Sequence, residues 1–426
     1  MTDRRAFLKQ AAALAASLPL LPGALAAEPA APTLQGPDKW RQLRQLFPLA
    51  PDVAHFANFL ITAHPRPVQE AIDRHRATLD RNPALCMDWE SQYEWQREDE
   101  VREWAGRYLD VRPRQVALTG STTEGLGMIY GGLHVAPHQE ILTTEHEHYS
   151  THNCLAFRQR QHGTQVRKLR LFDKPGEVST DRVLSLIDRS IRPETRVLGM
   201  TWVHSGSGVK LPVGAIGELV RQHNRNRDEA DRILYVVDGV HGFGVENVRF
   251  ADFNCDWFIA GTHKWMFGPR GTGIICAASE QMQHLTPTFA TFSRNEDFGT
   301  IMTPGGYHAF EHRWALGEAF KLHLALGKAD VQARIHQLND YLKARLAEHR
   351  AIELVTPVSR EFSAGFTFLR IKDRDPDAVA AYLNANKVMV DAVDRDVGPV
   401  IRFAPSLLND EQQIDRAMAL LRKQIG

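Results

Sequence analysis

The chain has 426 residues, of which 43% are hydrophobic and 24% charged, so it is long enough for a large core and a second, smaller domain. Basic and acidic residues number 51 each, and the formal net charge is zero. This balance argues against attraction to nucleic acid or to an anionic membrane through a general positive field, and it favours small-molecule chemistry.

The first 27 residues are typical of an export signal. Arg4 and Arg5 precede an Ala/Leu-rich run that ends at Ala27, and two prolines make this run a poor membrane anchor. The paired arginines resemble a twin-arginine (Tat) signal. We therefore expect residues 1–27 to be recognised by the Tat export machinery and cleaved, which would leave a periplasmic protein without a stable membrane anchor.

The middle of the chain alternates short apolar runs with helix-length amphipathic segments. The expected helices begin at Thr122, near Leu155, at Thr180 and at Val213, and the expected strands are VALTG, EILTT, VRKLRL, RVLGMTW, ILYVVD, DWFIAGT and TGIICA. This alternation predicts an α/β fold with a mostly parallel seven-stranded sheet. No helix-length segment separates the last two runs, which allows one antiparallel strand.

After about Ala290 the pattern changes to helices over 308–326 and 329–349, followed by strands FTFLRI, VMVDAV and VIRFAP with helices from Pro376 and Asp410. This order is typical of an α+β domain. We expect an N-terminal arm (28–65) that packs with the small domain, a large domain (66–295) and a small C-terminal α+β domain (296–426).

The first of three polar motifs at expected strand ends is Thr119-Gly120-Ser121-Thr122-Thr123-Glu124. Open α/β sheets place ligands at such ends. A glycine turn, hydroxyl groups and the free N–H groups of a helix N-terminus favour a phosphate. The same residues also fit a plain helix capping box, and both interpretations stay open.

The second motif places Asp238 at the end of the apolar run ILYVVD, and His241 follows three residues later. A carboxylate at the end of a buried strand needs a cationic partner, because desolvation of the charge is costly. A protonated pyridine nitrogen is one such partner. Alternatively, Asp238 caps a turn before Gly239.

The third motif is Thr262-His263-Lys264, which follows the apolar strand DWFIAGT and precedes a glycine-rich loop. Burial lowers the pKa of a lysine and so provides an amine nucleophile. The alternative is a solvated surface lysine, although the apolar residues on both sides of Lys264 are unusual for one.

In this order the three motifs resemble the class V aminotransferase family, fold-type I enzymes that depend on pyridoxal 5′-phosphate (PLP) and include isopenicillin N epimerase-like proteins. The resemblance runs from about Ala57 to the C-terminus and implies a homodimer. It makes Lys264 the catalytic lysine that holds PLP as a Schiff base, and Asp238 the partner of the ring nitrogen. The other cofactor-binding residues that it implies are Ser121, Thr122, Thr123 and His263 at the phosphate, His148 stacked on the ring, and His241 at the ring hydroxyl.

Two further segments resemble the family's substrate-binding elements. Arg402 matches an arginine that clamps the substrate carboxylate, and its alternative is a pair with a structural acid. Asn58 lies in a loop similar to one that borders the site, and residues 304–308 resemble a loop at the dimer interface. The chain departs from the family near Ser205, where relatives often have an asparagine.

The resemblance extends to Tat-exported members that tailor pyoverdine, and it implies a small-molecule or peptide-siderophore substrate whose glutamate is converted to succinamide. An amino-acid or peptide epimerase and an aminotransferase are the alternatives. A cysteine desulfurase is disfavoured because no cysteine follows Cys276 to carry a persulfide. A metal-binding protein that uses His146, His148 and His152 is the non-enzyme alternative; for the enzyme we expect no metal.

Overall fold

The computed structural model describes residues 34, 36, 38–87, 93–292 and 296–425. The expected export signal, residues 1–27, and the beginning of the expected arm lie outside the described residues. Within the described part, no helix is both long enough and apolar enough to cross a membrane.

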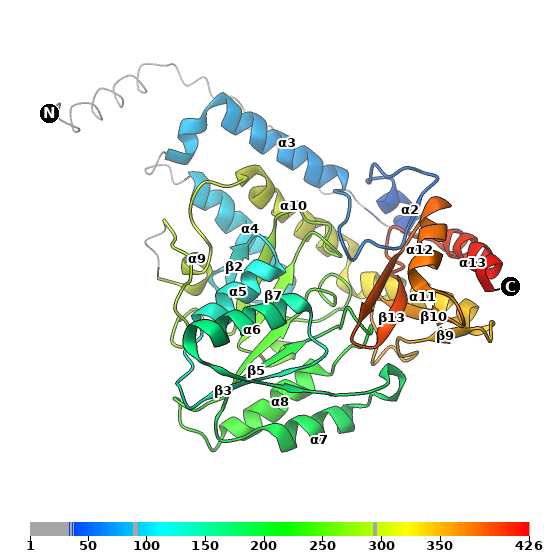
Figure 1. The fold of residues 1–426 in the computed structure, drawn as a ribbon. Coiled ribbons are helices and arrows are strands. Elements are labelled where there is room, and N and C mark those ends of the chain that lie inside the picture. Colours follow the sequence, from blue (N-terminus) through cyan, green and yellow to red (C-terminus); the bar gives the residue numbers. More distant parts are fainter. Residues whose placement is uncertain (1–33, 35, 37, 88–92, 293–295, 426) are drawn as a thin grey trace. The chain divides into compact units, whose positions relative to one another are not determined.

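The central element is a seven-stranded sheet with the order β2-β8-β7-β6-β5-β3-β4 (Figure 1). Its strands are β2 (Val116–Thr119), β3 (Glu140–Thr144), β4 (Gln165–Leu169), β5 (Thr195–Thr201), β6 (Leu234–Asp238), β7 (Trp257–Gly261) and β8 (Gly273–Ala277). Only β8 runs against its neighbours, because it pairs antiparallel with both β2 and β7. The expected mostly parallel sheet of seven strands is therefore confirmed.

Helices cover both faces of this sheet, which is why its strands are apolar along their whole length. Consecutive residues point to opposite faces: Val197 joins a core with α5 and α6, and Leu198 joins a core with α7 and α8. The helices are α5 (Thr122–Gly132), α6 (Tyr149–His162), α7 (Thr180–Ser190) and α8 (Val213–Asn224).

A second group of helices packs beside the large sheet. Helix α10 (Phe310–Leu326) lies against α3 (Arg66–Arg81) and α4 (Tyr93–Leu109). The short helices α2 (Lys39–Arg44) and α9 (Phe298–Ile301) complete this part, together with 3-10 turns at Pro83–Met87, Pro113–Gln115, Pro175–Glu177 and Phe250–Phe253.

The C-terminal part is built on an antiparallel sheet of order β12-β13-β10-β9 with its own apolar core (Figure 1). The elements are α11 (Lys328–Ala347), β9 (Ile352–Leu354), β10 (Thr367–Ile371), α12 (Pro376–Ala385), β11 (Val388–Met389), β12 (Asp391–Arg395), β13 (Gly398–Phe403) and α13 (Glu411–Ile425). The run VMVDAV, expected as one strand, forms two. Strand β11 pairs in parallel with β1 (Ala54–His55) of the N-terminal arm, whereas β12 pairs with β13.

Candidate active site

A cavity of about 160 Å³ lies at the carboxyl ends of the central parallel strands. All eight residues expected to hold the cofactor line it, although they come from four separate segments of the chain. Its lining consists of Ser121, Thr122, Thr123, His148, Ser150, Thr201, Ser205, Asp238, Val240, His241, His263 and Lys264. The topology explains the convergence, since β2, β5, β6 and β7 point their carboxyl ends to the same edge of the sheet.

Lys264 lies in a tight loop that begins where β7 ends. The loop is closed by hydrogen bonds from Phe267 N to Lys264 O at 3.1 Å and from Gly268 N to Thr262 O at 2.8 Å. Burial lowers the pKa of Lys264 from 10.5 to about 8; the negative charge of Asp238 opposes this shift, and Arg402 and Arg395 add to it. A sizeable fraction of Lys264 is therefore an unprotonated, nucleophilic amine at mildly alkaline pH.

Asp238 is the last residue of β6 and is only 4% exposed. The main-chain N–H of Val240 donates to Asp238 Oδ1 at 3.1 Å. Burial raises the pKa of Asp238 from 3.8 to about 6, against the opposing effects of that hydrogen bond and of Lys264. The geometry fits a ligand with a positively charged nitrogen, which would offset the desolvation of the carboxylate.

The beginning of α5 contains a helix cap and also groups suited to bind a phosphate, the two interpretations that the sequence left open. The hydroxyl of Ser121 accepts from Glu124 N at 3.1 Å and therefore caps the helix, and Glu124 Oε2 accepts from Gly120 N at 2.5 Å, one residue before the N-cap position of a regular capping box. Thr122 Oγ1, however, is buried and has no hydrogen-bond partner among the described residues. This orphaned hydroxyl, next to N–H groups at a helix N-terminus, fits the phosphate of PLP.

His148 and His241 present neutral rings to the cavity. His148 caps α6, where its Nδ1 accepts from Ser150 N at 3.2 Å, and burial lowers its pKa from 6.5 to about 4, helped by Arg395 and Lys264. His241 is buried, accepts from Trp265 Nε1 at 3.4 Å, and has a pKa well below its usual range for the same reason. A neutral imidazole suits stacking on an aromatic ring, or a hydrogen bond to its hydroxyl.

The two residues expected to bind substrate do not line the cavity. Arg402 donates through Nε to Asp391 at 2.7 Å, through Nη2 to the same carboxylate, and through Nη1 to Ser205 O at 2.8 Å. Arg402 thus makes the ion pair that was weighed as its alternative, and its role toward a substrate stays a prediction. Asn58 donates to His55 O at 2.8 Å and to Ser406 Oγ at 3.1 Å, so it links the arm to the small domain.

Four lining residues were not among the expected cofactor ligands: Ser150, Thr201, Ser205 and Val240. Thr201 ends β5, so the strand-end rule that found Asp238 also applies to it. Its side chain bonds the buried carboxyl of Glu147. Burial raises the pKa of Glu147 to about 7, and its hydrogen bonds to Thr201 and Thr144 act in the opposite direction. No sequence signal indicated this acid.

The histidines of the metal-binding alternative point to different partners. His146 Nδ1 bonds Asp396 Oδ1 at 2.6 Å, His148 Nδ1 contacts Ser150 Oγ at 2.6 Å, and His152 Nε2 lies 2.9 Å from Thr144 O. Within the described part of the chain, no cluster of three or more His, Cys, Asp or Glu side chains is arranged to hold a metal ion.

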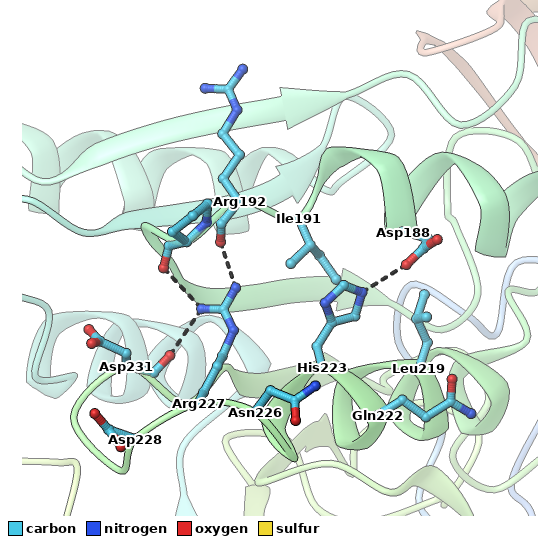
Figure 2. Close-up of a pocket in the computed structure, with 11 residues that line it drawn as sticks. Asp188, Ile191, Arg192, Leu219, Gln222, His223, Asn226, Arg227, Asp228 and Asp231 are labelled. Atoms are coloured by element: carbon cyan, nitrogen blue, oxygen red, sulfur yellow. Dashed lines mark hydrogen bonds and ion pairs between the residues drawn. The ribbon is translucent and has the colours of Figure 1, made fainter.

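A second, larger hollow of about 710 Å³ lies beside α7 and α8 (Figure 2). Its central cation, Arg227, donates to the main-chain oxygens of Arg192, Pro193, Thr195 and Asp231, and His223 bonds Asp188 at 2.8 Å. Thr195 begins β5, so this hollow lies at the amino ends of the strands, opposite the cavity around Lys264. Arg227 and His223 are thus engaged in structural contacts.

Comparison with known proteins places the chain among PLP enzymes. The family model described as aminotransferase class-V matches residues 62–407. Isopenicillin N epimerases of Streptomyces clavuligerus and Amycolatopsis lactamdurans are 25% and 26% identical, over 88% and 90% of this chain and 96% and 98% of the relatives. A probable cysteine desulfurase of Halalkalibacterium halodurans is 23% identical over 71% of this chain and 74% of its own length.

Solved structures agree on the fold. A mutant of C-DES with glycine covalently linked to its PLP cofactor aligns with a TM-score of 0.80 at 19% identity, over 89% of this chain and 98% of that chain. The apo cysteine desulfurase of Thermococcus onnurineus NA1 aligns with a TM-score of 0.75 at 17% identity, over 90% of this chain and 98% of that chain. These similarities, together with the family match, confirm the fold-type I architecture.

Proposed function

The chain belongs to the aminotransferase class V family and is a PLP-dependent enzyme; on this premise we propose that it works in the periplasm and converts the N-terminal glutamate of a pyoverdine siderophore precursor to the succinamide form. The proposal that the protein is an active PLP enzyme rests on one observation: Lys264, Asp238 and the N-terminus of α5 line the same cavity. The export signal and the resemblance to pyoverdine-tailoring members support the location and the substrate.

PLP, when bound, supplies an electron sink that stabilises negative charge at the substrate α-carbon. Residues of this chain would hold the cofactor and keep it in its reactive form. Asp238 would keep the ring nitrogen protonated, His148 would offer its neutral ring for stacking, and Thr122 Oγ1 with the α5 amides would bind the phosphate. Lys264 Nζ would attach the cofactor, and as an amine with a pKa of about 8 it is suited to accept a proton from the substrate.

A desulfurase activity is not proposed, although relatives with that name match the chain. The two most C-terminal cysteines, Cys255 and Cys276, are buried in the large domain. Burial raises the pKa of both thiols well above the usual range. A buried, protonated thiol is a poor persulfide carrier.

The substrate proposal is tested by incubating the purified, PLP-loaded protein with the glutamate-bearing precursor in the presence of dioxygen, because the conversion removes the carboxylate carbon and oxidises the α-carbon. Mass spectrometry should detect the loss of CH₂O from the precursor. An unchanged precursor with fully loaded protein would refute the substrate while leaving the cofactor assignment intact.

An epimerase is the second candidate, favoured by the isopenicillin N epimerases that match nearly their whole length. Epimerisation exchanges the proton on the α-carbon and leaves the rest of the substrate unchanged. Incubation of candidate peptides in D₂O would therefore introduce one deuterium at that carbon without loss of carbon. A protein that epimerises a peptide but leaves the pyoverdine precursor unchanged would replace the first proposal with this one.

The homodimer is also a proposal. Phe289 and Phe292 are 52% and 49% exposed, and Tyr307, in the loop at 304–308, is 71% exposed. Phe292 and Tyr307 contact each other, with ring centroids 6.3 Å apart, so they form a local apolar patch. Analytical ultracentrifugation should give a dimer for the wild-type protein and a weaker one for Tyr307→Glu.

A further inference from the structure

A second buried acid lies behind the wall of the cavity. Glu147 follows β3 and is 7% exposed. Its Oε1 accepts from Thr144 Oγ1 at 2.7 Å and from Thr201 N at 3.2 Å, and its Oε2 forms a hydrogen bond with Thr201 Oγ1. Thr201 lines the cavity and Glu147 does not, so Thr201 links this carboxyl to the cofactor site.

The hydrogen bonds of Glu147 decide which of its oxygens can carry a proton. The main-chain N–H of Thr201 can only donate, so Oε1 is an acceptor. Thr144 Oγ1, which accepts from His146 N at 3.1 Å, then gives its own hydrogen to Oε1 as well. Two donors thus point at Oε1. A proton on this carboxyl must therefore lie on Oε2, between Glu147 and Thr201 Oγ1.

The protonation state of Glu147 consequently sets the direction of the Thr201 hydroxyl. If the carboxyl is ionised, Thr201 donates its hydrogen to Oε2 and presents only lone pairs to the cavity. If Oε2 is protonated, it donates to Thr201 Oγ1 and releases the hydroxyl hydrogen. No other of the described residues forms a hydrogen bond with Thr201 Oγ1, so the released hydrogen is available to an acceptor in the cavity.

The surroundings of Glu147 favour its protonated form. Burial raises the pKa of Glu147 to about 7 against the opposing effect of its hydrogen bonds, and the negative charge of Asp238 adds to the rise. Strand register pairs Asp238 with Thr201, so both acids lie at the same edge of the sheet. The other titratable groups that face Glu147 are the phenols of Tyr130 and Tyr235. Burial raises the pKa values of both phenols well above the usual range, so both are neutral.

A similar contact at the opposite end of β5 has different surroundings. Glu140, the first residue of β3, accepts from the hydroxyl of Thr195, the first residue of β5, at 2.7 Å. Arg167 also donates to Glu140, through Nε at 3.0 Å. Hydrogen bonds from Arg167 and Thr195 keep the pKa of Glu140 low despite its burial. Glu140 is therefore an ionised acid in a glutamate–threonine pair, and it provides a matched control for Glu147.

We propose that Glu147 is a positioning residue that carries a proton on Oε2, donates it to Thr201 Oγ1 and so turns the Thr201 hydroxyl hydrogen toward the bound cofactor. When Glu147 loses this proton, Thr201 turns its hydrogen back and becomes an acceptor. This inference rests on the proposed function as a PLP enzyme, and it does not depend on which substrate the enzyme takes.

Infrared difference spectra of the PLP-loaded protein between pH 6 and pH 9 detect this proton, because a protonated carboxyl and a carboxylate absorb at different frequencies. The wild type should show a protonated-carboxyl band at pH 6 that Glu147→Gln loses and Glu140→Gln keeps. In Thr201→Val the band should shift to higher frequency, because the acid O–H loses its acceptor, and Thr201→Ser should restore its position. A pH 6 band that Glu147→Gln leaves unchanged would overturn the proposal.

Binding of pyridoxine 5′-phosphate to the cofactor-free protein tests the hydroxyl of Thr201. This analogue lacks the aldehyde and so binds without reaction at Lys264. By calorimetry, Thr201→Val should weaken binding about 10-fold at pH 6, where the hydroxyl donates, and less than about 2-fold at pH 9. In the Glu147→Gln background the amide always donates to Thr201, so the loss should be about 10-fold at both pH values.

An equal effect of Thr201→Val at pH 6 and pH 9 in the otherwise wild-type protein would contradict the proposed turn of the hydroxyl. The visible absorbance of bound PLP is recorded before the infrared measurement. A wild-type protein without this absorbance would refute the proposed function, whereas a loaded protein without a band that depends on Glu147 would refute this inference alone.

Discussion

Asp238 is a buried acid that lowers the stability of the protein without its cofactor. Its pKa is raised from 3.8 to about 6, so the folded state holds this proton more tightly than the unfolded state does. Stability therefore falls as pH rises through this range, and the full loss is about 3 kcal/mol, at about 1.4 kcal/mol per pKa unit. Asp238→Asn removes the charge and keeps an oxygen that accepts from Val240 N.

The cofactor-free variant should be more stable than the cofactor-free wild type by up to about 3 kcal/mol at pH 8. The difference should fall below about 1 kcal/mol near pH 4, where the folded carboxyl is protonated and the unfolded one is about half protonated. Urea unfolding followed by circular dichroism at the two pH values measures both quantities. With PLP bound the comparison changes, because a ring-nitrogen cation offsets the wild-type charge; the cofactor should stabilise the wild type more than the variant.

Asp396→Asn is the control, because the surroundings of Asp396 lower the pKa of its carboxyl, whereas those of Asp238 raise it. His146 Nδ1 lies 2.6 Å from Asp396 Oδ1, and this hydrogen bond keeps the pKa of Asp396 low despite its burial. Its replacement should destabilise the protein at pH 7. Equal or lower stability of cofactor-free Asp238→Asn at pH 8 would refute the view that Asp238 is a buried charge in need of a cation.

The other predictions concern the remaining contacts of the cofactor. Lys264→Ala should lose the visible absorbance of the bound cofactor, and a borohydride-reducible chromophore elsewhere would contradict the assignment. In the wild type, the rate of covalent loading should rise between pH 7 and 9 and then level off, because the Lys264 amine has a pKa of about 8; a rate that rises up to pH 10.5 would exclude this. Thr122→Val should weaken PLP binding about tenfold in a fluorescence titration, whereas Thr151→Val, which removes another buried unpartnered hydroxyl outside the cavity lining, should not. His148→Ala should weaken PLP binding by about 3- to 10-fold, and His148→Phe should retain it, since stacking requires only an aromatic ring.

The local pattern of the sequence was sufficient to predict the large sheet and the residues at its edge. Seven apolar runs, each with the length of one strand, alternate with amphipathic helices, and polar residues such as Asp238 and Lys264 follow directly where the apolar runs end. A continuous apolar run is required of a strand that is covered on both faces, and ligands bind where such strands end. Both signals are local, so they can be read without knowledge of the three-dimensional arrangement.

The partners of the arginines and the split of VMVDAV depended on tertiary structure. Nothing near Arg402 in the chain indicates that Asp391 occupies its guanidinium, because that pair arises from the register between β12 and β13. Likewise, the N-terminal arm takes β11 into a separate parallel pair, which a run of apolar residues does not reveal. The sequence alone therefore determined the strands, the edge of the sheet and the place of Lys264 at that edge, whereas tertiary packing decided which charges meet, because a salt bridge depends on contacts between residues far apart in the chain.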